Sequence, residues 1–278
     1  MNGTLKMSVA IGTSGWSYKE WEKVFYPDSK TPKLSYYSSI FGTAEIDSTF
    51  YANPSKGLVF GWLRNTPKDF QFSVKLPQTI THKKQLDLEQ GVEIDLDNFV
   101  ALLKPLHDAN KLGPLLIQLP PSFDSEKMEK LEKFFEIIPK DHMFAVEFRN
   151  KSWLEETKDL CALLSHHNVA NTIVDEPLLP IDLTVTSKEF AFVRWHGKGK
   201  RIWYDYEYSE EEIDPWIPKV REIASKTKKT FGYWNNHFHG FAIENGLELL
   251  EKLELATDKQ KETLASVREY IREHNVEG

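Results

Sequence analysis

Residues 114–148 read PLLIQLPPSFDSEKMEKLEKFFEIIPKDHMFAVEF, and this stretch contains a complete strand–helix–strand pattern. Its two ends, 114–119 and 143–148, are short and apolar, as strands buried on both faces are. Between them, residues 125–138 repeat apolar side chains at helical spacing. These side chains are Met128, Leu131, Phe134 and Phe135. The stretch therefore predicts one β-α-β unit of a parallel sheet.

The same alternation extends over the rest of the chain. The predicted strands are 8–13, 44–49, 71–76, 114–119, 143–148, 170–175, 191–196 and 229–235. The predicted helices are 33–41, 56–65, 97–110, 125–138, 152–167, 209–226 and 240–252. Eight strands about 30 residues apart predict an α/β fold, the (β/α)8 TIM barrel, which has roughly 250 residues. We therefore expect residues 1–278 to form a single domain.

Residues 176–181 interrupt this alternation between the sixth and seventh strands. They read EPLLPI, and two prolines so close together do not allow a regular helix interior. We expect an extended crossover here and an incomplete ring of helices. An open doubly wound sheet is the alternative fold, but the turn after the first strand, GTSGW at 12–16, lacks the glycine spacing of a dinucleotide-binding loop.

Composition excludes several classes of protein. The chain has 278 residues, with 35 basic and 42 acidic side chains and a net charge of −7, which disfavours nucleic acid as a partner. Its one cysteine, Cys161, rules out a disulfide framework and a cysteine-rich metal site. The first residues lack a secretory pattern, and no apolar run reaches the roughly 18 residues of a membrane span. We expect a cytoplasmic protein with no membrane contact.

Polar residues gather where the predicted strands end. Alternate residues of a barrel strand point inward, and barrel enzymes place their chemistry at the carboxyl ends of the strands. The residues assigned to this inner set are Glu45, Asp47, Thr49, Ser73, Lys75, Gln118, Glu147, Arg149, Asp175, Arg194 and His196, and the eighth strand ends in Asn235, Asn236 and His237. The set predicts a charged pocket at the barrel mouth. Its alternative is a buried ion-pair scaffold, for which Glu45 is the strongest candidate because it lies deepest.

The leading functional hypothesis is an enzyme, of undecided reaction class, that acts on a phosphorylated or otherwise anionic small substrate. The predicted catalytic residues are Glu147, Asp175, His196 and Asp47. Glu147 and Asp175 form the expected acid/base pair, because two neighbouring carboxylates separate their pKa values. The predicted substrate-binding residues are Arg149, Arg194, Lys75, Gln118, Asn235, Asn236, His237, Trp16 and Tyr51. A basic loop at 197–201, GKGKR, offers further cations and glycine amides, or is simply solvated.

Three alternatives stay open. Aromatic side chains near the strand ends, Trp16 and Tyr51 above all, suit a glycoside or nucleoside hydrolase. His82, His196, His237 and His239 with nearby carboxylates would suit a metal-dependent phosphodiesterase that processes nucleic acid. No diagnostic metal-ligand spacing is present, so we predict no cofactor and keep a divalent metal only under that alternative. The third alternative is a barrel that binds a ligand without catalysis. No pattern indicates the oligomeric state.

The chain resembles the YecE-like family, known as domain of unknown function 72. The shared motifs are GTSGWSY (12–18) with Trp21 and FYP (25–27), EIDSTFY (45–51), QLPPSF (118–123), VEFR (146–149) with Ser152 and Trp153, RWHG (194–197) and NNH (235–237). They span residues 11 to about 250 in the order typical of the family. Trp234 departs from the usual Phe, which is a conservative change. The resemblance implies a TIM barrel and no established reaction.

Overall fold

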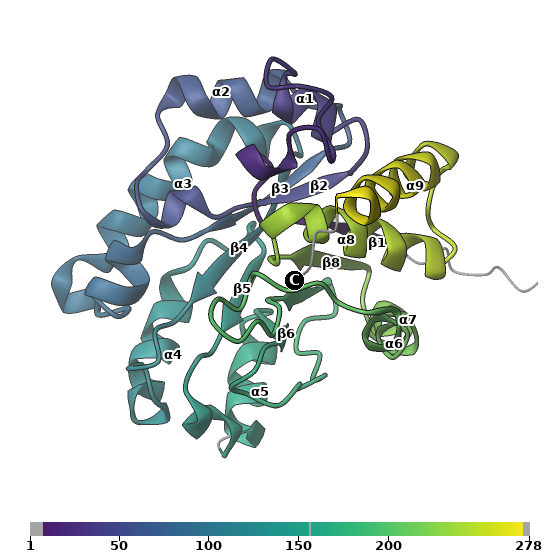
Figure 1. Ribbon diagram of the computed structural model, residues 1–278. Coiled ribbons are helices and arrows are strands. Elements are labelled where there is room, and N and C mark those ends of the chain that lie inside the picture. Colours follow the sequence, from purple (N-terminus) through teal and green to yellow (C-terminus); the bar gives the residue numbers. More distant parts are fainter. Residues whose placement is uncertain (1–7, 156, 275–278) are drawn as a thin grey trace, which may run out of the picture.

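The computed structural model describes residues 8–155 and 157–274, and its centre is a barrel of eight parallel strands (Figure 1). The strands are β1 (Val9–Thr13), β2 (Thr43–Ile46), β3 (Gln71–Lys75), β4 (Leu112–Gln118), β5 (Phe144–Glu147), β6 (Ala170–Asp175), β7 (Phe190–Trp195) and β8 (Lys229–Trp234). Each strand from β2 to β7 pairs with the next along the chain, and β8 pairs with β1. The predicted TIM barrel is confirmed. The residues before 8, where the sequence lacks a secretory pattern, lie outside the described part.

Helices surround the strands, with α2 and α3 at the upper left of Figure 1 and α7 to α9 at its right. The helices are α1 (Lys33–Tyr37), α2 (Lys56–Arg64), α3 (Val92–Asp108), α4 (Met128–Ile137), α5 (Thr157–His166), α6 (Glu210–Ile213), α7 (Trp216–Lys226), α8 (Phe241–Lys252) and α9 (Asp258–Glu273). The prediction of one helix over 209–226 was wrong. Pro215 separates α6 from α7, because proline has no N–H to continue the hydrogen-bond ladder. None of the described helices is long and apolar enough to cross a membrane.

The connection between β6 and β7 contains no helix, as its prolines predicted. Residues 176–189 run in an irregular path. Asp182 organises this path, since its carboxylate accepts hydrogen bonds from the Thr184 backbone N–H (3.0 Å) and the Asn171 side chain (3.2 Å). Farther on, the Thr186 hydroxyl accepts the Asn171 N–H at 2.7 Å. The Thr186 side chain thus satisfies the Asn171 backbone amide of β6, which would otherwise lack a hydrogen-bond acceptor.

The barrel closes between β1 and β2 at one narrow point. There Ser14 and Glu45 form an isolated bridge, and the Gly15 N–H donates to the Glu45 carbonyl at 2.8 Å. Farther down the seam, a Cβ at position 12 would lie only 2.1 Å from the Thr43 carbonyl oxygen. Gly12 therefore allows the two strands to approach each other, which a larger residue would prevent.

Tyr37, from α1, fills the rest of this seam with its hydroxyl. The hydroxyl accepts the Thr13 backbone N–H at 2.9 Å and donates to the Thr43 carbonyl at 3.0 Å. It thereby joins β1 to β2 where no direct ladder exists. From inside the barrel, the Tyr233 hydroxyl lies 2.7 Å from the Thr43 side-chain oxygen. Two buried tyrosines thus satisfy polar groups that closure leaves open.

The barrel interior changes from apolar to charged along the strands. Its apolar cluster consists of Leu116, Ala145, Ala170, Phe190, Phe192, Phe231 and Tyr233. The neighbouring outward side chains pack under the helices, where Trp195 stacks on Trp234 with ring centroids 4.5 Å apart. On β7, the inward residue after Phe192 is Arg194. The large aromatic rings therefore support a charged layer at the carboxyl ends of the strands.

Candidate active site at the barrel mouth

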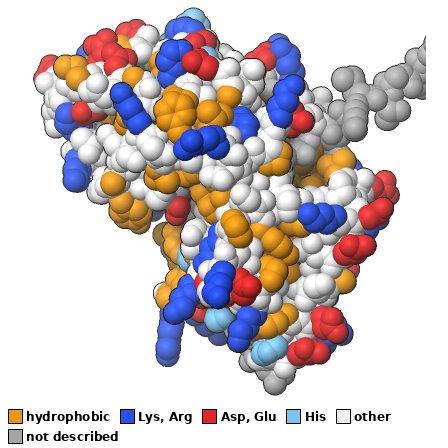
Figure 2. All heavy atoms as spheres, turned by 90° about the horizontal axis from the view of Figure 1, so that it is seen from above, with side chains coloured by type: hydrophobic (Ala, Val, Ile, Leu, Met, Phe, Trp, Pro, Cys, Tyr) orange, Lys and Arg blue, Asp and Glu red, His pale blue; other side chains and the backbone are white. Residues whose placement is uncertain are grey.

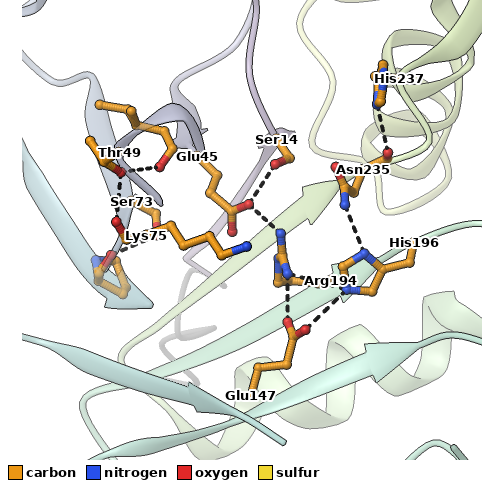
Figure 3. Close-up of polar contacts among 12 residues, drawn as sticks. Ser14, Glu45, Thr49, Ser73, Lys75, Glu147, Arg194, His196, Asn235 and His237 are labelled. Atoms are coloured by element: carbon orange, nitrogen blue, oxygen red, sulfur yellow. Dashed lines mark hydrogen bonds and ion pairs between the residues drawn. The ribbon is translucent and has the colours of Figure 1, made fainter. Parts of the chain in front are cut away.

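Arg194 lies at the centre of the charged layer (Figure 3). Its Nη2 is 2.6 Å from Glu45 Oε1, and its Nη1 is 2.7 Å from Glu147 Oε2. The Ser14 hydroxyl donates to the same Glu45 oxygen at 2.7 Å. The side chains of Arg194 and both glutamates are at most 2% exposed. This ion network joins β1, β2, β5 and β7 across the barrel.

Arg149 extends the network toward solvent. Its guanidinium contacts Glu147 on one side and Glu176 on the other, and its side chain is 10% exposed. Burial by itself would raise the pKa of Glu147, but the guanidinium groups of Arg149 and Arg194 outweigh it and hold this pKa well below its usual value. Burial raises the pKa of Glu176 above its usual value despite the contact with Arg149. Glu147 is therefore an ionised partner of two arginines, and Glu176 is the carboxylate more easily protonated.

His196 lies beside the same arginines. Arg149 Nη2 lies 2.8 Å from its Nε2, and the Asn235 side-chain amide lies 2.9 Å from its Nδ1. Burial, followed by the positive charges of Arg149 and Arg194, lowers the pKa of His196 to about 3. The imidazole is therefore neutral at physiological pH and acts as a hydrogen-bonding group.

Lys75 enters the mouth from β3 and points toward the Glu45–Arg194 pair (Figure 3). Every carboxylate of the network is paired with an arginine, and in the described part of the chain the Lys75 ammonium forms no ion pair. Its Nζ lies 4.1 Å from the centre of the Phe50 ring. Burial, followed by the charge of Arg194, lowers the pKa of Lys75 to about 8. The mouth therefore contains one cation without a carboxylate partner.

A shallow hollow of about 200 Å³ adjoins this network between β1 and β2. It is lined by Gly15, Trp16, Ser17, Tyr18, Ile46, Asp47 and Ser48. The Tyr18 ring stacks on His237 with centroids 4.3 Å apart, and its hydroxyl donates to the Ser14 carbonyl at 2.7 Å. Because this hollow is smaller than the roughly 300 Å³ of a typical ligand pocket, it has room for only part of a small-molecule ligand. Asp47 therefore lies at the rim of this hollow, and His237 lies beside its Tyr18.

Two predicted site residues, Asp175 and Asn236, do not face the barrel mouth. Asp175 pairs in register with Trp195, whose ring packs outward against Trp216, so the carboxylate also lies outside the barrel. There it contacts Lys198 at 3.3 Å. The expected Glu147–Asp175 pair is thus wrong, because the inward residues of β6 follow the alternation that begins at Ala170.

Asn236 is the second. Its side-chain amide donates to the Asn245 side chain at 2.8 Å and to the Tyr206 carbonyl at 2.9 Å. It is fully buried and attaches the segment after β7 to α8. The next residue back, Asn235, is the asparagine that reaches His196. The prediction that Asn236 binds substrate was therefore wrong.

The predicted aromatic residues do not form a stacking platform. Trp16 packs on Trp62 and Phe72, with ring centroids 6.5 Å and 5.7 Å away, on the helix side of β3. Tyr51 is 75% exposed and has its ring 5.1 Å from Phe50. The two rings thus contact different neighbours, and of the two Trp16 lines the hollow between β1 and β2. Gln118 is half-buried and pairs in register with Glu147, so it faces the mouth as predicted.

The basic loop after β7 is occupied by its own contacts. Lys198 contacts Asp175 and, at 3.4 Å, Glu212. The Gly197 N–H donates to the Tyr208 hydroxyl at 3.1 Å, and the Gly199 N–H donates to the Trp203 carbonyl at 3.3 Å. These amides are therefore not free to bind an anion, which contradicts that part of the expectation. Lys200 and Arg201 are exposed.

Sequence reasoning missed three residues of the mouth: Glu176, Ser14 and Tyr18. Glu176 follows β6 directly and has the same alternation as Ala170, so a correct inward assignment would have found it. Tyr18 and Ser14 were present in a quoted motif, but nothing local indicates that one packs on His237 and the other bonds Glu45. Both contacts join residues that are far apart in the sequence and meet only when the barrel closes.

The histidines proposed as metal ligands lie apart. His82 bonds Thr81 at 2.9 Å and packs on Phe50, whereas His237 stacks on Tyr18. Among the described residues, the one group of three histidine or acidic side chains within mutual reach is His107, Asp141 and His142, near the amino end of β5. The rings of His107 and His142 are stacked 8° from parallel, so their in-plane lone pairs do not converge on one ion. The metal-dependent alternative gains no support from this arrangement.

Figure 2 shows one face of the molecule, where lysine and arginine side chains are interspersed with acidic and apolar ones. This face does not present the continuous basic surface of an extended nucleic-acid interface. The mixture agrees with the overall net charge of −7.

A family model described as "Protein of unknown function DUF72" matches residues 10–269. The chain belongs to this family. The resemblance inferred from its motifs is thereby confirmed. The UPF0759 protein YunF of Bacillus subtilis is 29% identical over 270 residues, which are 89% of this chain and 95% of that protein. The UPF0759 protein YecE of Escherichia coli K12 is 28% identical over 170 residues, covering 60% of this chain and 59% of its own.

Solved DUF72 structures share the fold. A crystal structure of a DUF72 family protein from Thermotoga maritima superposes with a TM-score of 0.79 at 34% identity, covering 89% of this chain and 99% of that one. A DUF72 family protein from Enterococcus faecalis gives a TM-score of 0.76 at 25% identity, covering 90% and 99%. These names state no activity. The function of this DUF72 protein must therefore be argued from its own mouth residues.

Proposed function

We propose that this DUF72 protein is an enzyme that binds a small anionic substrate at the barrel mouth and acts on it by acid/base catalysis. The observation that carries the proposal is Lys75, a cation inside the mouth with no carboxylate partner among the described residues. The anion would approach Lys75 from solvent. Arg149, 10% exposed, would lie beside it.

The pairing of charges in the mouth supports an anionic ligand. Of the cations Arg149, Arg194 and Lys75, the two arginines are in direct ion pairs with glutamates, and Lys75 is in none among the described residues. Ion pairing with a ligand would recover part of the desolvation cost of the lysine. Arg194 has both terminal nitrogens on glutamates, so we assign it to support of the network and Lys75 to the ligand.

We assign the acid/base role to Glu176 in place of the predicted pair. A group that exchanges protons near neutral pH needs a pKa shifted toward that range, and burial shifts the pKa of Glu176 upward. Glu147 instead stays ionised and orients Arg149. Neutral His196, whose two ring nitrogens contact Arg149 and Asn235, would hold Arg149 in position beside the substrate. Asp47 at the rim, with the adjoining hollow, would contact a polar part of the substrate.

Calorimetric titration with inorganic phosphate tests the proposal. We expect the wild-type protein to bind phosphate and Lys75→Met to weaken the binding at least 10-fold, since one ion pair at a partly buried site contributes about 1.5–3 kcal/mol. Lys104→Met is the matched control, because Lys104 is exposed on α3 and pairs only with Asp108. Equal affinity in wild type and Lys75→Met, or no phosphate binding by the wild type, would contradict the proposal.

A further inference from the structure

The amine of Lys75 is placed as a nucleophile rather than as a member of the ion network. Glu45 Oε1 is held by Arg194 and Ser14, and Glu147 by two arginines, and no ion pair joins the amine to either carboxylate in the described part of the chain. The second Glu45 oxygen, Oε2, is buried and has no hydrogen-bond partner there. The Nζ instead lies over the face of Phe50, 4.1 Å from the ring centre. A structural buried lysine looks different. The Lys111 ammonium, near the other end of the barrel, donates to three oxygens, of Leu63 and Thr66, at 2.8–3.0 Å.

We propose that Lys75 forms an imine with the aldehyde or ketone group of an anionic substrate. The proposal deepens the proposed function, because it rests on the same mouth and names the substrate class as a small carbonyl compound that carries a carboxylate or phosphate. The anion would lie toward Arg149, and the carbonyl carbon would lie at Lys75 Nζ.

The chemistry balances without an added oxidant or reductant. The amine lone pair attacks the carbonyl carbon, a C–N bond forms, and the C=O π electrons move to oxygen, which takes a proton. The nitrogen then loses one of its two protons, which gives a neutral carbinolamine. Its hydroxyl takes a second proton and leaves as water while the nitrogen lone pair forms the C=N bond, so the product is a protonated imine. The protonated imine withdraws electrons, so it makes a neighbouring C–H or C–C bond easier to break.

The surroundings of Lys75 supply both requirements of this reaction. The first is free amine: a pKa of about 8 leaves roughly one Lys75 in ten unprotonated at pH 7. Besides burial, the charged groups that shift the pKa of Lys75 are Arg194 from β7, Glu147 from β5, Glu45 from β2 and Arg149 after β5. The second is a group that can take up the proton released by the nitrogen. Burial, followed by the charge of Lys75, lowers the pKa of His82 to about 4, so this ring is neutral at pH 7, and it packs against the same Phe50 ring with the ring centroids 4.7 Å apart.

Reductive trapping tests the inference. The full-length protein is incubated with glyoxylate and sodium cyanoborohydride, and the modified lysines are located by peptide mass spectrometry. We expect Lys75 to be labelled at least about 10-fold faster than exposed Lys104 at pH 7, because its amine is less protonated. Its labelling rate should rise with an apparent pKa of about 8. Labelling of Lys75 no faster than of Lys104 would overturn the inference.

Two variants separate nucleophile from charge. Lys75→Arg keeps the positive charge and should still bind phosphate, but it should lose the rapid label. Lys104→Arg should keep that label. A rapid label that persists in Lys75→Arg would overturn the imine. Neutral glycolaldehyde separates this inference from the proposed function: equally fast labelling of Lys75 by glycolaldehyde and glyoxylate would support the imine and count against anion recognition.

Discussion

Arg194 shows most clearly how one residue supports the mouth. It is 2% exposed, and its two terminal nitrogens each contact a fully buried glutamate. Two negative charges in the barrel interior are tolerable only while this guanidinium is present, because an unpaired buried charge is costly. The same ionic contacts hold the carboxylates in place beside Lys75.

Replacing Arg194 by Met should therefore destabilise the fold strongly. We expect the free energy of unfolding in urea to fall by about 3–5 kcal/mol, because Glu45 and Glu147 lose their common partner. Adding Glu45→Gln and Glu147→Gln to Arg194→Met should restore part of this loss. A loss below about 1 kcal/mol would mean that solvent reaches the glutamates after all.

The lowered pKa of His196 predicts how the stability of the protein depends on pH. Its pKa is about 3 in the folded protein, below the usual 6.5, so only the unfolded chain takes up its proton between these values. The contribution of neutral His196 to the free energy of unfolding should be fully present above pH 6.5 and should decrease as the pH falls from 6.5 toward 3. Between pH 7 and pH 5 the decrease is about 2 kcal/mol. Urea unfolding of His196→Gln should show a decrease smaller by that amount, whereas identical slopes in both proteins would refute the assignment.

At the level of elements, the β1–β2 seam is the place where the barrel depends on side chains. Among the described residues, the direct backbone connections are the Ser14–Glu45 bridge and the Gly15 N–H. The Tyr37 hydroxyl bridges Thr13 and Thr43 in place of the missing ladder. Since Ser14 and Glu45 also belong to the charged network, the closure of the barrel and the geometry of the mouth depend on the same residues.

Tyr37→Phe should therefore cost about 1–3 kcal/mol of unfolding free energy, the penalty for leaving buried backbone groups unpaired. Tyr36→Phe is the matched control, since the neighbouring tyrosine packs on Phe25 and its hydroxyl has no recorded hydrogen bond in the described part of the chain. Thermal or urea unfolding of both variants measures the difference. Equal stability of the two variants would show that water replaces the Tyr37 hydroxyl.

On the scale of the whole molecule, the barrel is covered unevenly. Helices follow most strands, but residues 176–189 cross from β6 to β7 without one. β5 and β6 also pair over only two residues in register, Ala145 with Ala170 and Val146 with Asn171. Few ladder bonds and little helical cover both lower the free energy of local opening.

Hydrogen exchange should therefore be fastest on this side. We expect the amides of 176–189 to exchange sooner than those of α7 or β8, at a pH where the whole protein is stable. The Asn171 amide, paired with a side chain and not with a strand, should be the first of β6 to exchange. Uniform protection around the barrel would argue against local opening and for a single cooperative unit.

The order of the strands, the extended crossover and the inward direction of Glu147, Arg194 and His196 all followed from the amino-acid sequence. These features depend on local periodicity and on proline, which act within a few residues. The sequence motifs taken together were also enough to recognise the family. The same reasoning placed Asp175 on the wrong face, since alternation gives two sets of side chains but does not say which set is inside, and it assigned Asn236 to the mouth because it follows the eighth strand.

Only the tertiary structure decided how the charged side chains are paired. Arg194 bonds carboxylates from β2 and β5, and Arg149 holds Glu147 and Glu176, whereas Lys75 forms no ion pair with any described residue. These choices depend on the register between strands and on the distances that closure of the barrel imposes. The energy of an ion pair falls with distance and with solvent exposure, and both are properties of the folded chain.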